Sequence, residues 1–400
     1  MMSKSTTGLP TKNATAVAAE GIGSHFHYVV ILDDDSLAFL APLLDPKICP
    51  SRVILVAEEH QQVFLHYTQR YLTQHEVQCE TWLIPSQRGL EYMCQSIQQY
   101  LSKESHPLAL NMGKTHTQLA LLLQHYFLMR KWPIFYCSDH YVHRVYPQHK
   151  QSRLKPVIHI SDLCFMRSFE IQSSITLQQF DYYLLQFTQQ LLTAFPEITT
   201  ALGLIHYLAD TVDLKHHILE SERIKAHHLL ENQFKHVIEQ FEQVGCFTLQ
   251  RGSLLFTSPI HHYLCRGGWV FLCISDYLLQ NHQKYPVYDI QCAITLTSKV
   301  HTLKELTLEA IYVVRDQVYA CVVLPYFYDD DQEYSLLDQW HFVHAFYKKC
   351  KQVHIHAVVV SYQVVDPLLK EWGQDLGVHV CDQVSIQNLA GMCDQLFESV

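Results

Sequence analysis

The chain has 400 residues, a formal net charge of −10 at pH 7, and 48% hydrophobic against 17% charged residues. This balance is typical of globular proteins, and the length allows two or three domains with cores of their own. The negative charge argues against a protein that mainly grips nucleic-acid backbone, which requires clustered Lys and Arg. No apolar run approaches 18 residues, so we expect no membrane span.

The first 23 residues are small and polar and lack the apolar core of a secretory signal, so we expect a flexible tail. Thirteen cysteines are scattered without a Cys-x-x-Cys pair, which favours reduced, mostly buried thiols and a cytoplasmic protein. Several histidines are paired or alternate, but none has a Cys or acid partner at zinc-site spacing. No metal site is predicted from them.

Strand and helix patterns alternate four times within residues 24–160. The expected strands are His27–Leu32, Arg52–Ala57, Gln78–Ile84 and Pro107–Asn111, and helices are expected after the first strand and at 60–75, 88–104 and 117–130. Two further segments, Trp132–Cys137 and Tyr141–Tyr146, are typical of a closing hairpin. Such alternation predicts a Rossmann-like parallel sheet of the doubly wound type.

In doubly wound sheets, ligands bind beyond the carboxyl ends of the strands. Two polar loops are expected at that edge, and both precede helices that would present free N–H groups to an anion. Gly113-Lys114-Thr115 resembles the end of a phosphate-binding P-loop, but Leu108 stands where its first glycine belongs, so a P-loop ATPase is not expected. The predicted ligand contacts are Asp33, Asp34, Ser36, Asn111, Gly113, Lys114, Thr115 and Thr117.

Residues 161–262 have helical periodicity near 175–193, 199–211 and 221–244. A short hairpin follows, from Cys246–Gln250 to Ser253–Thr257, so we predict a helical, winged-helix-like module. The helix 221–244 carries Glu, His and Gln rather than a basic stripe. A spacer or dimerisation role is therefore favoured over DNA binding.

Residues 263–400 predict an α/β domain with a mixed sheet. A helix is expected from Pro259 through Trp269 to about Asn281, followed by strands and helices to the end of the chain. The stretch Leu306–Pro325 reads as two apolar, β-branched strands joined by a turn at Arg315–Gln317. Its first strand carries one acid, Glu309.

Five short motifs together give the chain a family resemblance over nearly its whole length. They are Asp33-Asp34-Asp35-Ser36 with Ala41-Pro42-Leu43-Leu44-Asp45 beyond it, Asn111–Thr117, Trp132-Pro133-Ile134-Phe135, Gly267-Gly268-Trp269, and the hairpin Leu306–Pro325. In order and spacing they resemble the CRISPR-associated Rossmann-fold (CARF) ancillary nucleases. Those proteins join a cyclic-oligoadenylate sensor domain to a restriction-endonuclease-like PD-(D/E)xK domain.

The resemblance implies a homodimer whose paired sensor domains hold cyclic tetra-adenylate across the two-fold axis. It also implies cleavage of DNA or RNA with a divalent metal. Asn111 and Gly113 match the sensor loop of the family, whereas Thr117 falls where a basic residue is expected, with Lys114 nearby.

The nuclease motif of the family is matched only by Glu309. Phe271, Val322 and Leu324 stand where the helix Glu and the Glu-x-Lys pair are expected. Metal-dependent cleavage needs several carboxylates to hold the cation and a lysine-like group beside them. We therefore predict a pseudonuclease with vestigial positions 271, 322 and 324, and no cofactor; Mg²⁺ or Mn²⁺ is expected only if the nuclease is active.

Three hypotheses follow for the function. The first is a cytoplasmic cyclic-oligoadenylate sensor in CRISPR-type antiviral defence that passes its signal by contact, with nucleic acid not expected as a partner. The second is a metal-dependent nuclease with acids relocated to Asp276, Asp289 or Glu305. The third is a ring nuclease that cleaves its own ligand with Lys114 or a threonine hydroxyl.

Overall fold

A computed structural model describes residues 26–32, 36–45, 48, 50, 52–85, 89–113, 118–138, 141–147, 149–153, 159–212, 219–298, 305–315, 317–325, 335–352 and 355–397. The chain divides into two compact units, residues 1–168 (unit 1) and 169–400 (unit 2).

Unit 1 is built on a seven-stranded sheet with the strand order β3-β2-β1-β4-β5-β6-β7. Its strands are β1 (His27–Ile31), β2 (Arg52–Glu58), β3 (Gln78–Ile84), β4 (Leu108–Asn111), β5 (Ile134–Ser138), β6 (Tyr141–Tyr146) and β7 (Lys150–Arg153). The first five strands are parallel, and β6 and β7 add to the edge as antiparallel strands. The predicted Rossmann-like sheet and its closing hairpin are confirmed; the short, polar β7 was not predicted.

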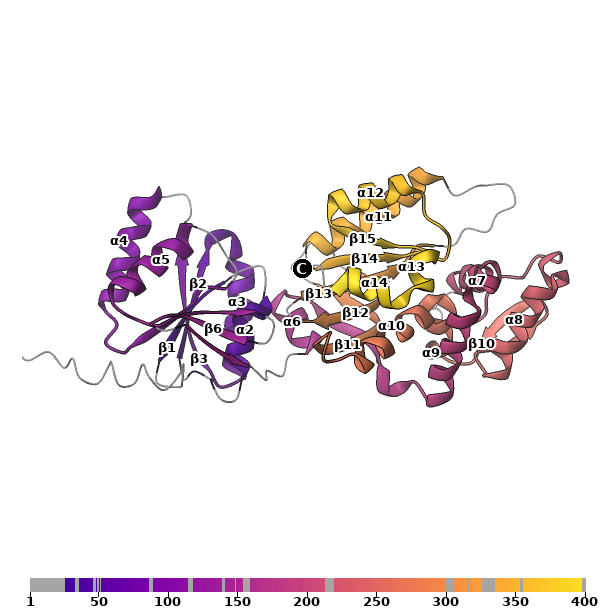
Figure 1. Cartoon of the computed structure of the whole chain (residues 1–400), viewed down its shortest axis with the longest axis horizontal. Coiled ribbons are helices and arrows are strands. Elements are labelled where there is room, and N and C mark those ends of the chain that lie inside the picture. The colour runs from indigo at the N-terminus through magenta and orange to yellow at the C-terminus, as the bar shows by residue number, and fades with distance from the viewer. Residues whose placement is uncertain are drawn as a thin grey trace, which may run out of the picture. The chain divides into compact units, whose positions relative to one another are not determined.

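Helices cover both faces of this sheet, with α4 and α5 on one side and α2 and α3 on the other (Figure 1). They are α2 (Ser36–Leu44), α3 (Gln62–Gln74) after the short η1 (Glu59–Gln61), α4 (Gly89–Ser102), α5 (Gln118–Met129) and α6 (Ile160–Met166). Alternate strand residues such as Val29 and Ile54 pack with Ile97 of α4 and Leu123 of α5. Burying both faces explains why these strands are near-continuous apolar runs.

Unit 2 contains a six-stranded mixed sheet with the order β15-β14-β13-β12-β11-β8. The strands are β8 (Glu170–Thr176), β11 (Val287–Thr297), β12 (Glu305–Val314), β13 (Gln317–Val323), β14 (His356–Val360) and β15 (Val378–Cys381). β13, β14 and β15 run parallel, and the remaining neighbours are antiparallel. The predicted mixed sheet and the β12–β13 hairpin are confirmed.

The helices of unit 2 pack on both faces of its sheet, with α11 and α12 on one side and α10 and α14 on the other (Figure 1). The elements before the main sheet are η3 (Leu177–Gln179), α7 (Tyr182–Asp210), η5 (His228–Leu230), α8 (Asn232–Gln243) and the hairpin β9 (Phe247–Gln250) and β10 (Ser253–Phe256). Then follow α9 (Pro259–Tyr263), the π-turn η6 (Leu264–Gly268), α10 (Trp269–Gln280), α11 (Leu336–Gln352), α12 (Pro367–Leu376), α13 (Gln383–Gln387) and α14 (Leu389–Phe397).

One hydrophobic core runs through unit 2. It joins Phe187 of α7 and Phe241 of α8 to Trp269, to Tyr312 of the sheet and to Phe397 of α14. The helical module and the C-terminal sheet are thus packed on each other, and their division at residue 262 stays a prediction. The described cysteines are all free, and all but Cys79 and Cys94 are buried.

The two helices predicted near 175–193 and 199–211 form one helix, α7, with Pro196 inside it. An interior proline removes a hydrogen bond and costs about 3 kcal/mol. Here the helix continues because fourteen of its residues are buried, among them Phe195 and Ile198 on either side of the proline. α7 is long and apolar enough to cross a membrane by length and composition alone, but 56% of that stretch is buried within the protein, as in a core helix.

Two further segments differ from the prediction: a strand that was not predicted, at the start of the module, and the first part of the helix predicted at 221–244. Residues 170–176 form the edge strand β8, which pairs with β11; its polar sequence has no clear strand periodicity, and its backbone pairing is set by the neighbouring strand. Residues 221–231 are not an α-helix. The backbone N–H groups of Ser221 and Ile224 instead donate to Leu254 and Gly252, so this segment pairs with the small hairpin.

Candidate functional site

The carboxyl ends of β1 and β4 lie side by side at one edge of the sheet in unit 1. The two strands are parallel neighbours and Val30 pairs with Asn111, so the chain leaves both strands at the same edge. Of the predicted ligand contacts, the structure describes Asn111 and Gly113, together with the backbone of Ser36 at the start of α2. The others lie outside the described residues: Asp33, Asp34, Lys114, Thr115 and Thr117.

Asn111 is the best-defined side chain at this edge. It is fully buried, and its Oδ1 accepts a hydrogen bond from the backbone N–H of Gly113 at 3.2 Å. Gly113 adopts φ of +60°, which glycine reaches without steric cost. The Nδ2 group of Asn111 is buried and has no hydrogen-bond partner among the residues described. Leaving a buried donor unpaired is costly, so this amide is the polar group of the described edge that calls for a further acceptor.

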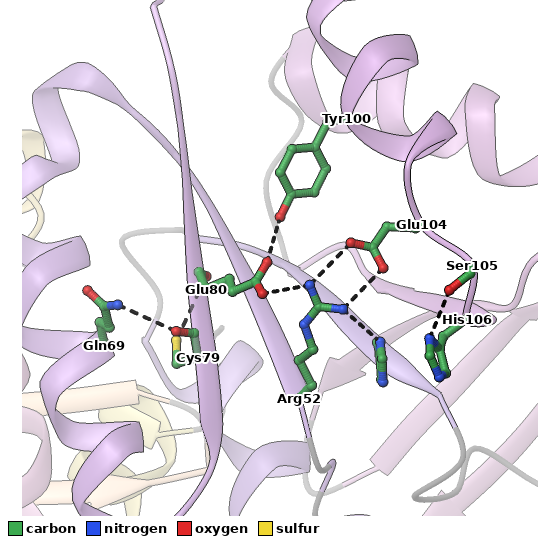
Figure 2. A network of polar contacts seen from close by, with 9 residues as sticks. Arg52, Gln69, Cys79, Glu80, Tyr100, Glu104, Ser105 and His106 are labelled. Carbon is green, nitrogen blue, oxygen red and sulfur yellow. Dashed lines mark hydrogen bonds and ion pairs between the residues drawn. The ribbon is translucent and has the colours of Figure 1, made fainter.

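An ion-pair network closes the opposite edge of the same sheet, at the amino ends of the strands (Figure 2). Arg52, the first residue of β2, contacts Glu80 of β3 at 2.7 Å and donates to Glu104, before β4, at 3.1 and 3.2 Å. Tyr100 donates to Glu80 at 3.2 Å, and Arg52 donates to Nδ1 of His27 at the same distance. The bonds from Arg52 lower the pKa of Glu80. Because every charge here has a partner within the fold, we assign this network to stability.

The hairpin of unit 2 places the predicted nuclease positions in an apolar setting. Ala310 pairs with Cys321, so the next step of the antiparallel ladder sets Glu309 opposite Val322. Val322 and Leu324 are each 6% exposed, and Phe271 is fully buried in the core. None of these three side chains has an oxygen or nitrogen atom that could bind a metal or orient water.

Glu309 itself is paired with a cation of the protein. Its carboxylate is 3.3 Å from Nη2 of Arg266, whose Nε donates to Asp210 Oδ1 at 2.7 Å. The second oxygen of Asp210 lies 3.2 Å from Nε2 of His206, one turn earlier on α7. His206, Asp210, Arg266 and Glu309 form what we call the hairpin ion cluster, which connects the end of α7 to β12.

The pKa values of the two carboxylates in the cluster are shifted in opposite directions. Burial raises the pKa of Glu309, and the nearby charge of Arg266 only partly opposes this. Burial would also raise the pKa of Asp210, but the hydrogen bond and charge of His206, together with Arg266, lower it to about 2. Asp210 is therefore ionised at neutral pH, whereas burial makes ionisation of Glu309 less favourable.

The described residues do not fit a divalent metal at this place. Among them, no group of three or more His, Cys, Asp and Glu side chains is arranged to hold a metal ion. Magnesium prefers several oxygen ligands, and the hairpin offers one carboxylate that already faces a guanidinium. We therefore derive no chemical step through a metal.

The turn that carries Arg266 is fixed from two sides. The hydroxyl of Tyr263 donates to the backbone carbonyl of Glu309 at 2.9 Å, and Nε2 of His262 lies 2.8 Å from the carbonyl oxygen of Ala209. Burial lowers the pKa of His262, so its neutral ring donates to that carbonyl through Nε2. The position of Arg266 is thus set by contacts to both α7 and β12.

The glycines of the Gly267-Gly268-Trp269 motif are required by close packing. Gly267 has φ of +103°, and a Cβ added there would lie 2.7 Å from the hydroxyl oxygen of Tyr362. A Cβ on Gly268 would lie 2.4 Å from the ring of Tyr263. Trp269 is 1% exposed and stacks on Tyr362 with 5.8 Å between ring centroids. This motif therefore shapes the turn beside the hairpin.

The acids proposed as relocated ligands are not among the charged groups that shift the pKa of Glu309. Asp276 accepts hydrogen bonds from Gln189 and Gln280 at 3.1 and 2.8 Å. Oδ1 of Asp289 accepts a hydrogen bond from the backbone N–H of Ile290 at 2.8 Å, and Glu305 is exposed at the start of β12. Their role in catalysis stays a prediction that the structure does not support.

Comparison with known proteins gives structural matches only. No protein-family model and no curated protein sequence matches the chain. Protein VC1899 from Vibrio cholerae matches with a TM-score of 0.74 and 16% sequence identity, over 94% of this chain and 99% of that one. Can2 from Sulfobacillus thermosulfidooxidans, solved in complex with cyclic tetra-adenylate, matches with a TM-score of 0.66 and 13% identity, over 92% and 97%.

The chain shares its fold with VC1899 and Can2. Both matches extend over nearly the whole length of both proteins, so the likeness includes the Rossmann-like sheet and the mixed sheet. The fold predicted from the five sequence motifs is confirmed. A shared fold does not decide activity, which depends on the side chains at the site.

Sequence reasoning placed Asn111 at the carboxyl edge of the sheet and predicted the hairpin, but it missed the charged groups of the hairpin ion cluster. Arg266 is separated from Asp210 by 56 positions and from Glu309 by 43, so no local motif connects them. The spacing of His206 and Asp210, one helical turn apart, was the one local pattern that could have drawn attention to α7.

Proposed function

We propose that this chain is a sensor of cyclic oligoadenylate, with cyclic tetra-adenylate as the first candidate ligand, in antiviral defence of the CRISPR type. The observation that carries the proposal is the near full-length likeness to Can2, a protein solved with cyclic tetra-adenylate bound. The carboxyl edge of the sheet in unit 1 supports it, because the buried amide of Asn111 has a donor there without a partner among the described residues.

Unit 2 acts in this proposal as a pseudonuclease that passes the signal by contact. Two features around the hairpin support this role. Phe271, Val322 and Leu324 are apolar and buried, and Glu309 forms an ion pair with Arg266. A site that has lost most of its charged groups loses most of its transition-state stabilisation.

The proposal includes a homodimer formed through unit 1. Its support is an exposed apolar stripe on α5, the helix that follows the Asn111 loop. Leu121, Leu128 and Met129 are 59%, 42% and 71% exposed, and their spacing places them on one face of the helix. We expect Leu128→Glu to shift the chain from dimer to monomer in light scattering, whereas Leu279→Glu in unit 2, also at an exposed leucine, leaves the dimer intact.

Isothermal titration calorimetry tests the sensor proposal. Cyclic tetra-adenylate should bind the full chain, and linear tetra-adenylate of the same length should bind at least tenfold more weakly, because it must lose more conformational freedom. Parallel titrations with cyclic tri- and hexa-adenylate show which ring size the chain binds most tightly. If no cyclic oligoadenylate binds, the sensor proposal is wrong and only the fold remains.

Asn111 variants connect the binding to the sheet edge. Asn111→Ala removes the unpaired donor, and we expect roughly a tenfold loss of affinity, the worth of one buried hydrogen bond. Asn281→Ala in unit 2 is the matched control, since that amide is already used on the carbonyl of Tyr277. Equal affinities for the two variants would remove Asn111 from the ligand site.

A further inference from the structure

Three aromatic rings of unit 1 gather where β5 and β6 pair. The rings of Tyr136 and His143 are stacked, with 4.7 Å between their centroids and an angle of 7° between their planes. The two residues are also cross-strand partners in the antiparallel ladder. The ring of Tyr141, at the start of β6, lies 6.3 Å from that of His143. We call these three residues the β5–β6 aromatic cluster.

The cluster lies at the carboxyl edge of the sheet. Asn111, the last residue of β4, pairs with Phe135, and the backbone N–H of Met112 donates to the carbonyl of Phe135 at 3.0 Å. Because β4 and β5 are parallel, Tyr136 stands one residue beyond the end of β4. Tyr141 begins β6, the antiparallel neighbour of β5, at the same edge. The cluster and the buried amide of Asn111 are therefore carried by neighbouring strands at one edge.

The hydrophobic core under α4 and α5 ends before Tyr136. Ile134, two positions earlier on the same face of β5, is fully buried in that core, whereas Tyr136 is 36% exposed. On β6, Val145 packs against the same core, and His143 precedes it by two positions on the same face. The stacked rings therefore continue the apolar face of the sheet beyond its buried core, and the ring of Tyr136 is partly open to solvent.

We propose that the β5–β6 aromatic cluster is a stacking platform for an adenine base; this rests on the proposed function, in which unit 1 binds a cyclic oligoadenylate. The bases of a small RNA ring are unpaired, so their faces are open to contact. Proteins recognise such bases by stacking them on Tyr, Phe, Trp or His side chains. Removal of one such contact weakens binding by roughly 5- to 150-fold.

The stacked arrangement prepares the tyrosine ring for a base. His143 covers one face of Tyr136 and thereby fixes the orientation of its ring. A surface that is ordered before binding loses less conformational entropy than one that must be ordered by the ligand. The edge then offers two kinds of contact: the aromatic surface of Tyr136 for a base, and the Nδ2 donor of Asn111, which has no partner among the described residues, for a polar group.

Isothermal titration calorimetry of the full chain with cyclic tetra-adenylate tests the proposal. Tyr136→Ala should weaken binding at least roughly fivefold. Tyr136→Leu keeps an apolar side chain but has no aromatic face, so it should lose about as much affinity, and it replaces Tyr136→Ala if that variant does not fold. Tyr136→Phe keeps the ring and loses only the hydroxyl group, so its affinity should stay within about twofold of that of the unaltered chain.

A fluorescent ring gives a readout that does not depend on the folding of any variant. In this probe, 2-aminopurine replaces one adenine of cyclic tetra-adenylate, and its fluorescence is quenched when the base stacks on an aromatic ring. Saturating amounts of the unaltered chain should quench the probe, and Tyr136→Leu should quench it less. A probe that binds the unaltered chain without quenching would contradict the stacking platform.

Tyr100→Ala is the matched control. The ring of Tyr100 stacks on Trp82 in the same unit, with 4.4 Å between centroids and 8° between planes, a geometry close to that of Tyr136 and His143. Its hydroxyl donates to Glu80 in the network at the amino ends of the strands. This variant should lower the midpoint of thermal unfolding of unit 1 and leave the affinity for cyclic tetra-adenylate unchanged, because a stacked pair away from the ligand serves stability alone.

The possible outcomes separate the platform from the sensor proposal. If the unaltered chain binds the ring and folded Tyr136→Ala and Tyr136→Leu bind it equally well, the platform is wrong and the sensor proposal stands. An equal loss in Tyr136→Phe would also overturn the platform, because it would assign the contact to the hydroxyl group. Failure of the unaltered chain to bind any cyclic oligoadenylate would contradict the sensor proposal, and the platform with it.

Discussion

The carboxyl edge of the sheet in unit 1 and the hairpin of unit 2 differ in whether their buried polar side chains have a partner among the described residues. At the carboxyl edge, the amide of Asn111 is buried, and its Nδ2 has no partner in the part of the chain that the structure describes. At the hairpin, the acid Glu309 is paired with Arg266, and the positions around it are apolar. A buried polar group without a partner indicates recognition of something outside the fold, whereas a charge neutralised within the fold indicates stability. Variants in both regions can test this difference in pairing.

The largest effect is expected at the turn beside the hairpin. Gly267→Ala should destabilise unit 2 by about 3 kcal/mol, because the residue would be strained at positive φ and its Cβ would meet Tyr362 and Val323. Gly377→Ala, with φ of +78° and no atom near the added Cβ, should cost only about 1 kcal/mol. Urea unfolding of both variants measures the difference. Equal losses would mean that the turn is not closely packed on the hairpin.

The charged edge of unit 1 should affect stability and not binding. Arg52→Met leaves Glu80 and Glu104 without their partner and should cost about 2 kcal/mol, between the values for exposed and buried ion pairs. Cyclic tetra-adenylate should still bind with unchanged affinity, since the network lies at the amino ends of the strands. Calorimetry and urea unfolding on the same preparation separate the two quantities. A weaker affinity in a fully folded variant would place the ligand near this edge.

Asp210 should stabilise unit 2 in a pH-dependent way. Its pKa of about 2 lies below the unfolded value near 4, so its contribution is complete above pH 4 and is lost as the pH falls towards 2. Asp210→Asn should cost about 1.5 kcal/mol at pH 7 after allowance for partial exposure, and less at pH 3. The check is urea unfolding at both pH values. A loss that is independent of pH would show that the charge of Asp210 is not what matters.

Replacing Glu309 should have the smallest effect on the stability of unit 2, and its pH dependence should be opposite to that of Asp210. Burial raises its pKa, so its favourable contribution is complete below the unfolded value near 4.3 and is lost as the pH rises through the folded pKa. At pH 7, Glu309→Gln should change stability by less than about 1 kcal/mol, because the cost of burying the charge offsets its attraction to Arg266. Relative to this variant, the unaltered chain should gain stability when the pH is lowered to 4.5. A large loss at pH 7 would mean that the ionised carboxylate has a stabilising role that the cluster does not explain.

The fold was largely predictable because its central strands, such as β1 and β2, are buried along nearly their whole length. Four apolar strands with intervening helices predicted the parallel sheet, and the β-branched stretch around Arg315 predicted the hairpin. The errors occurred where tertiary packing outweighs local preference. Pro196 is inside a helix that buries both its sides, and the polar strand β8 is held by backbone bonds to β11.

The candidate sites were predictable in location but not in chemistry. The rule for parallel sheets placed Asn111 at the carboxyl edge of the sheet, and the apolar, β-branched pattern of Leu306–Pro325 placed Glu309 in the hairpin. The partner of Glu309 could not be foreseen, because Arg266 lies on another element and acquires its role only when the π-turn packs beside β12. The same holds for Arg52, whose two acids come from different parts of the sequence.

A cleavage assay tests the central claim, that unit 1 binds a ligand and unit 2 does not cut. The full chain is incubated with cyclic tetra-adenylate, Mn²⁺, and either supercoiled DNA or single-stranded RNA, at ligand concentrations that calorimetry shows to saturate the chain. We predict that both nucleic acids remain intact. Robust cleavage that disappears in Glu309→Gln would contradict the account and assign unit 2 to the active nucleases.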